Sequence, residues 1–165
     1  MDKEYYGIKI IKFASQRPRE TLGDDLAVNY IAAHMRNADK AEMEAQGLDS
    51  KEELISSEGT SLECFLAHTD KGVPVCFFGI ALTAIGFSIW MLASVDVKGC
   101  HKALVKCGMD YIREKVQDLG EVYNFIHIRN TRALRFIRHA GAELGPEVTL
   151  ENGETFTKFV IRKKE

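Results

Sequence analysis

The sequence has little of what marks several specialised classes of protein. Proline occurs only three times in 165 residues, and no repeat or low-complexity tract is present, so the pattern of a disordered or fibrous chain is missing. The 22 basic and 24 acidic residues leave a net charge of -2, which gives no overall basic excess of the kind that bulk nucleic-acid binding requires. A hydrophobic share of 45% predicts a folded protein of ordinary domain size.

The cysteines and the N-terminus carry no sign of secretion or of a metal site. The four cysteines form no C-x-x-C pair and no disulfide framework spacing, so reduced thiols are expected. Cys100, His101 and Cys107 could suggest zinc, but a fourth ligand at suitable spacing is missing, and no metal is predicted. The charged residues 1–4 are not followed by an apolar stretch, which predicts no secretory signal peptide.

Charge is absent from residues 73–95, a stretch long enough to cross a bilayer. The alternative is a pair of buried strands, because residues 75–82 and 87–92 are strand-length blocks rich in aromatic and β-branched residues. Glycines and small polar residues interrupt the stretch, and residues 83–86 suit a hairpin connection. We therefore predict two strands and no membrane span.

The near-zero net charge hides an uneven distribution. Residues 1–70 hold fourteen acidic and eight basic side chains, a net of -6, whereas residues 98–140 hold nine basic and four acidic ones, a net of +5. Three of the basic residues, Arg132, Arg135 and Arg138, recur at a spacing of three on a predicted helix. Solvation of an amphipathic helix explains them, an acidic protein partner would suit them equally, and nucleic acid is disfavoured because no aromatic platform accompanies them.

Periodicity and turn signals predict a single α+β domain over residues 1–165. Residues 1–61 should form a strand and a helical lead-in, with a helix capped by Asp24 or Asp25, a second capped by Asn37, and a third opened by Ser50 in a capping box. Residues 62–97 should form antiparallel strands, and 98–141 a long helix, a strand and a short helix. Residues 142–165 should form a hairpin that turns at Asn152-Gly153.

This order of elements resembles the GCN5-related N-acetyltransferase (GNAT) fold, and residues 130–142 resemble its late motif. Asn130, Ala133, Phe136 and Gly141 match that motif, but Ile137 stands where the family often has a tyrosine that protonates the departing coenzyme A thiolate. Isoleucine cannot donate a proton. The resemblance implies a three-layer α+β fold whose mixed, mostly antiparallel central sheet is flanked by helices.

The family's coenzyme loop corresponds to residues 94–104, where the glycine pattern is reduced to Gly99. The resemblance implies that a bound coenzyme, if any, would lie at the helix N-terminus, whose N–H groups favour phosphate. The candidate cofactor-binding residues are Ser94, Val95, Lys98, Gly99, Cys100, His101, Lys102 and Asn130, and the candidates for a catalytic base are Asp96, His101 and His127. Solvation of a helix face explains the lysines without a ligand, and a satisfied core histidine explains His127.

A second resemblance is carried by residues 30–43, which look like the opening "AANMRxADxxEI" of a family of short tailed-phage and prophage proteins. That family is GNAT-like and is often labelled internal virion or internal core protein. The resemblance implies a bacteriophage protein that assembles the internal core by contacts with phage or host proteins, in the host cytoplasm or the virion, and without efficient acetyl transfer. The alternative is an active acyl-coenzyme A N-acyltransferase acting on a protein or a small amine. No cofactor is required by the first hypothesis, whereas acetyl-coenzyme A is required by the second.

Overall fold

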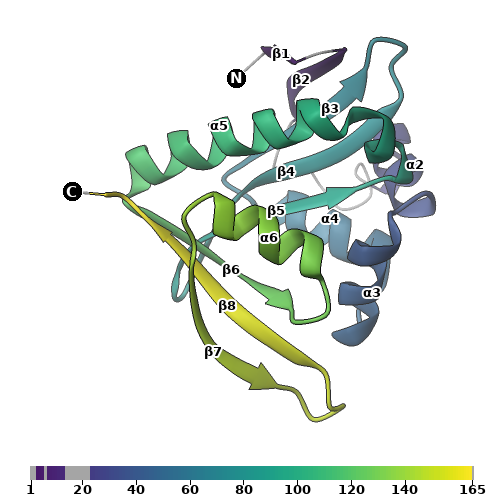
Figure 1. Cartoon of the computed structure of the whole chain (residues 1–165). Helices are drawn as coiled ribbons and strands as arrows, with labels where there is room; N and C mark the ends of the chain where they lie inside the picture. The colour runs from purple at the N-terminus through teal and green to yellow at the C-terminus, as the bar shows by residue number, and fades with distance from the viewer. Residues whose placement is uncertain (1–2, 6, 14–22, 165) are drawn as a thin grey trace.

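A computed structural model describes residues 3–5, 7–13 and 23–164 of the chain. Their strands form one eight-stranded sheet in the order β1-β2-β3-β4-β5-β6-β8-β7 (Figure 1). The strands are β1 (Lys3–Tyr5), β2 (Ile8–Phe13), β3 (Glu63–Thr69), β4 (Pro74–Thr83), β5 (Gly86–Ala93), β6 (Glu121–His127), β7 (Glu143–Thr149) and β8 (Thr155–Arg162).

Helices cover both faces of this sheet. The first group packs on one face and consists of α2 (Leu26–Ala33), α3 (Asn37–Ala45) and α4 (Ser50–Thr60). The second group lies on the other face and consists of the 3-10 turn η1 (Val95–Cys100), α5 (His101–Leu119) and α6 (Thr131–His139) (Figure 1). Two hydrophobic clusters, one on each face, result from this arrangement. The α+β class and the mixed, mostly antiparallel sheet predicted from the sequence are thereby confirmed.

The uncharged residues 73–95 form β4 and β5, as predicted. The two strands pair antiparallel from Cys76↔Ala93 to Thr83↔Gly86. Burial differs between them, because the middle of β4 is deeply buried, with Phe77 wholly inaccessible, whereas β5 is half-buried along most of its length and Met91 is exposed. Within the described ranges, no helix combines the length and the apolarity that a membrane crossing requires.

The helix starts were predicted correctly in part. Asp25 caps α2, since its carboxylate accepts from the N–H groups of Ala27 and Val28. The cap of α4 is Asp49 and not Ser50, because the Asp49 carboxylate accepts from the N–H of Glu52. The cap position of α3 is occupied by Arg36, one residue before the predicted Asn37, and no side chain bonds there.

The candidate site lies where strands β5 and β6 separate. Among the described strands, β5 and β6 are the parallel neighbours, and their ladder consists of the single pair Ser88↔Tyr123. Beyond this pair the strands diverge toward their C-terminal ends at Ala93 and His127. A parallel pair that separates in this way leaves backbone groups of both strands facing the space between them.

Candidate functional site

The β5 side of this gap is bonded by residues at the start of α3. The N–H of Ala93 donates to Oδ2 of Asp39 at 2.8 Å, and the carbonyl of Ala93 accepts from the N–H of Arg36 at 2.9 Å. The Nε of Arg36 donates to the same Asp39 oxygen at 2.9 Å. The end of β5 is thus joined to α3 by both of its backbone polar groups.

Asp39 is the most deeply buried carboxylate of this network, with 5% of its surface exposed. Burial raises the pKa of the Asp39 carboxyl, while the Arg36 guanidinium and the Ala93 N–H oppose that rise. A buried carboxylate is tolerated only when donors satisfy it, and here two donors converge on one oxygen. Asp39 therefore links α3 to the edge of β5 through hydrogen bonds.

The β6 side of the gap is bonded in the same way by Glu42, one helical turn further along α3. Its Oε1 accepts from the N–H of His127 at 3.2 Å and from Nδ2 of Asn130 at 2.8 Å. Burial raises the pKa of the Glu42 carboxyl, and these two donors oppose the rise. Asp39 and Glu42 lie three residues apart, which places them on one side of α3. One short helix thus bonds the ends of both diverging strands.

The narrower part of the gap is bridged by Asn124 of β6. Its Nδ2 donates to the carbonyl of Ile89 in β5 at 2.6 Å, and its Oδ1 accepts from the N–H of Phe125 at 2.7 Å. Together with the α3 contacts, five backbone groups along the two facing edges have partners within the chain. A ligand that needs those backbone groups would have to displace these partners.

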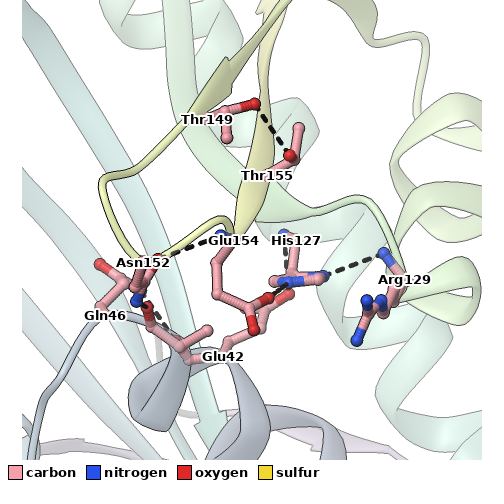
Figure 2. A network of polar contacts seen from close by, with 9 residues as sticks. Glu42, Gln46, His127, Arg129, Thr149, Asn152, Glu154 and Thr155 are labelled. Carbon is pink, nitrogen blue, oxygen red and sulfur yellow. Dashed lines mark hydrogen bonds and ion pairs between the residues drawn. The ribbon is translucent and has the colours of Figure 1, made fainter.

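His127 lies at the wide end of the gap, and its ring is fully engaged (Figure 2). Nδ1 accepts from the N–H of Arg129 at 3.0 Å, which assigns the ring hydrogen to Nε2, where it is donated to Glu154. That hydrogen bond lowers the pKa of the Glu154 carboxyl. In this tautomer neither ring nitrogen is free to accept a proton from a substrate, so His127 acts as the satisfied structural histidine considered above.

The turn of the β7–β8 hairpin closes the outer side of this region. Nδ2 of Asn152 donates to the carbonyl of Ala45 at the end of α3, at 2.7 Å. A cavity of about 570 Å³ remains between α3, the end of β6, the start of α6 and the hairpin turn. Its polar lining combines carboxylates with arginines, including Glu42, Glu44, Glu154, Arg129 and Arg132.

The predicted coenzyme loop is also bonded within the chain. Ser94 is fully buried, and its Oγ lies 3.0 Å from the Pro74 carbonyl oxygen. The N–H of Val95 donates to the carbonyl of His34 at 2.8 Å, and the N–H of Asp96 to Oγ of Ser94 at 3.3 Å. These N–H groups are therefore not directed at an anion.

Asp96 is held by Tyr30, whose hydroxyl donates to Oδ2 of Asp96 at 2.7 Å. This bond raises the pKa of the Tyr30 hydroxyl. An aspartate bonded to both α2 and the loop serves to join them, and its negative charge opposes phosphate at the same place. The two candidate bases Asp96 and His127 therefore have different partners, Tyr30 for Asp96 and Glu154 for His127.

The remaining predicted site residues lie at the surface or serve the fold. Lys98, Gly99, His101 and Lys102 are exposed, and Cys100 is half-buried, where burial raises the pKa of its thiol. A Cβ added at Gly99 would meet nothing within 4 Å of the protein, so packing does not demand glycine there. Asn130 caps α6 by accepting from the N–H of Ala133. Across the described residues, no group of three or more histidines, cysteines and acidic residues could hold a metal ion.

Ile137 occupies a core position, with 5% of its surface exposed, and packs in the cluster beneath α5 and α6. No proton donor stands at this point of the helix. Residues 130–142 thus keep a helix cap at Asn130 and a core residue at Ile137, with no proton donor at that core position.

Sequence reasoning missed the two residues that occupy the gap. Asp39 and Glu42 are the acidic positions of the phage-like motif in residues 30–43, so the signal was present as a pattern. Their partners, Ala93 and His127, are 54 and 85 residues away along the chain. Nothing local in the sequence indicates such pairings.

Comparison with known proteins identifies the fold. Neither a protein-family model nor a curated protein matches the chain. Among solved structures it is similar to a GNAT-family acetyltransferase from Bacillus anthracis, with a TM-score of 0.63, 13% identity and 98% of each chain covered. It is also similar to the ribosomal-protein-S18-alanine N-acetyltransferase of Escherichia coli, with a TM-score of 0.61, 14% identity and coverage of 94% and 93%.

A third similar structure is the spermidine/spermine N-acetyltransferase of Vibrio cholerae, with a TM-score of 0.57, 13% identity and coverage of 94% and 92%. Identities this low establish the fold alone. The residues described above do not fit a coenzyme bound between the strands, because five backbone groups on the facing strand edges and the loop N–H groups of Val95 and Asp96 already have partners. The chain therefore has the GNAT acetyltransferase fold, with the gap between its diverging strands bonded by its own side chains.

Proposed function

We propose that this protein uses the GNAT fold as a binding scaffold and does not transfer acetyl groups efficiently. The observation that carries the proposal is the pair of α3 carboxylates, Asp39 and Glu42, bonded to the N–H groups of Ala93 and His127. A coenzyme entering between the strands would need those edges. Each buried bond that it displaced would cost about 1–3 kcal/mol unless a ligand group replaced it.

The chemistry of the loop supports the same proposal. Asp96 places a negative charge where a transferase would receive pyrophosphate, and Ile137 supplies no proton for a leaving thiolate. The specific role that we propose is assembly of the internal core of a phage particle through contacts with other proteins. That role rests on the sequence resemblance to the phage proteins, which includes residues 30–43.

The alternative is an active acyl-coenzyme A-dependent N-acyltransferase. The cavity of about 570 Å³ at the wide end of the gap is the observation that favours it, since its volume lies within the range of small-molecule sites. Glu42 and Glu154 line that cavity and would be its candidate bases. Both carboxylates are occupied by hydrogen bonds from the chain, which weakens this alternative.

A thiol-release assay distinguishes the scaffold from the active transferase. It measures the free coenzyme A released from acetyl-coenzyme A in the presence of a panel of amines or of cell lysate. We expect no release above the rate without protein, with the Escherichia coli S18-alanine acetyltransferase and its substrate as the positive control. Steady release that depends on an added amine would establish the transferase instead. For the assembly role, mass spectrometry of purified particles and of assembly intermediates should detect the protein, and its absence from both would refute that role.

A further inference from the structure

We propose that the groove between the C-terminal half of α5 and the end of β8 binds an acidic segment of a partner protein that carries an apolar side chain. The groove has a volume of about 330 Å³. It deepens the proposed scaffold function by giving the partner a chemical class, but none of its residues belongs to the gap between β5 and β6. The two proposals can therefore fail separately.

The groove has an apolar floor. It is formed by five side chains from α5, the end of α6 and β8, namely Met109, Ile112, Val116, Ala140 and Ile161. Ile112, Val116 and Ile161 are nearly buried and belong to the core, so the floor is fixed by the packing of the fold. At about 330 Å³ it is at the lower end of the size range for small-molecule sites, which suits one apolar side chain with its neighbours rather than a large ligand.

The rim of the groove is basic and has no acidic member. Its charged residues are Arg113, Arg162, Lys163 and Lys164. Arg162 donates to Glu121 and Glu143 at 2.9 and 2.6 Å, so its charge is used within the fold. Lys163 and Lys164 are exposed and form no ion pair with any residue of the described ranges. These two lysines are the part of the rim that is open to a partner.

The positive surface continues beyond the groove. Ala140 in the groove floor directly follows α6, whose exposed side carries Arg132, Arg135 and Arg138. The sequence of α6 contains no acidic residue that could neutralise them. Figure 1 shows α5 and α6 on the same side of the sheet, with the C-terminal end of β8 next to the last turn of α5. The groove is therefore bordered by basic residues along more than one element.

This combination favours one partner chemistry. Carboxylates suit the lysine rim, and an apolar side chain suits the recessed floor, as in protein interfaces that have an apolar centre and a polar border. Nucleic acid is disfavoured because no aromatic residue lines the groove on which a base could stack. A membrane surface is disfavoured because the apolar atoms form a floor between α5 and β8 and not a protruding face.

The test uses the full chain and a fluorescein-labelled synthetic peptide rich in glutamate with a central leucine and phenylalanine. Binding is followed by fluorescence anisotropy at low and at physiological salt. We expect saturable binding that is weakened about tenfold or more by the double substitution Lys163→Glu and Lys164→Glu, and by exchange of the two apolar peptide residues for serine. The matched control is Lys71→Glu with Lys98→Glu, two exposed lysines outside the groove, which should leave the affinity within about twofold.

Three outcomes would overturn the proposal. The first is no binding of the peptide at about 1 mM protein, which corresponds to less than about 4 kcal/mol of binding free energy. The second is equal loss of affinity in the groove variant and the control variant, which would indicate nonspecific charge attraction. The third is stronger binding of a single-stranded oligonucleotide or of anionic vesicles than of the peptide. Circular dichroism of each variant establishes that it is folded.

Discussion

The bond between Asp39 and the end of β5 gives the most informative single perturbation of this molecule. Replacing Asp39 with alanine leaves the fully buried Ala93 N–H without its acceptor, which costs about 1–3 kcal/mol. The ion pair with the partly exposed Arg36 adds at most about 1 kcal/mol. Removing a buried carboxylate gives back part of its desolvation cost. We expect a net loss of about 1–3 kcal/mol in the free energy of unfolding.

Asp39→Asn refines this prediction. Because Arg36 and the Ala93 N–H donate to the same oxygen, an amide oxygen at that place can accept from both, and only the charge attraction to Arg36 is lost. A smaller loss, of at most about 1 kcal/mol, is expected. The matched control is Asp49→Asn, because asparagine caps a helix as well as aspartate does and should change stability by less than about 0.5 kcal/mol.

Equilibrium unfolding in urea measures these differences. Trp90 is the only tryptophan in the sequence, and its Nε1 donates to Oγ of Ser61 at 2.8 Å, so its fluorescence reports on the packing of β5. In thermal unfolding, each kcal/mol should lower the midpoint by about 2–4 °C. A change of less than about 0.5 kcal/mol for Asp39→Ala would refute the reasoning, since the buried N–H would then have another partner.

Three further predictions concern packing and charge. Gly79→Ala places a Cβ 2.2 Å from the Glu63 carbonyl oxygen across the β3–β4 pair, so it should abolish folding or lower the free energy of unfolding by more than about 3 kcal/mol. The control Gly99→Ala should be near neutral, because the added Cβ meets nothing within 4 Å. Circular dichroism and urea unfolding compare the two variants. Although burial opposes it, hydrogen bonds from Lys115 and Tyr111 lower the pKa of the Glu63 carboxyl. A lowered pKa stabilises the fold above the ordinary value of 4.5, and this stabilisation is lost as the pH falls through the pKa of the folded state. In urea unfolding, the stability advantage of the wild type over Glu63→Gln should therefore shrink below pH 4.5, and a constant difference would contradict this. Ile137→Tyr restores the residue type of the family motif but overpacks the core, so it should cost about 1–3 kcal/mol and yield no thiol release; gain of transferase activity would show that the absent acid is the main defect.

The fold could be predicted from the sequence because its signals are local. Uncharged blocks of strand length gave β4 and β5, helical spacing gave α5, and Asn152-Gly153 marked the C-terminal hairpin turn. The 3-10 turn before α5 was missed, because residues 95–97 were assigned to the strands and residues 98–100 to the segment of the long helix, whereas the turn spans Val95–Cys100. The α4 helix continues to Thr60 although Ser56, Ser57 and Gly59 are poor helix formers, because Leu54 and Ile55 pack on the sheet.

The candidate site could be predicted only where it repeats a local motif. The role of Asn130 as a cap and the core position of Ile137 follow from spacing along one helix. The bonding of α3 to both strand edges joins segments that are far apart in the chain, and it depends on how far β5 and β6 diverge, which no periodicity encodes. The uneven distribution of charge along the sequence has a partial structural explanation, because the basic residues 98–140 include the exposed arginines of α6.

A crystal structure of the protein grown with acetyl-coenzyme A would test the central claim most directly. The account predicts that Asp39 stays bonded to the Ala93 N–H and Glu42 to the His127 N–H, and that no coenzyme density lies between β5 and β6. Density for the coenzyme thioester between these strands, with either carboxylate displaced from its N–H group, would contradict the account.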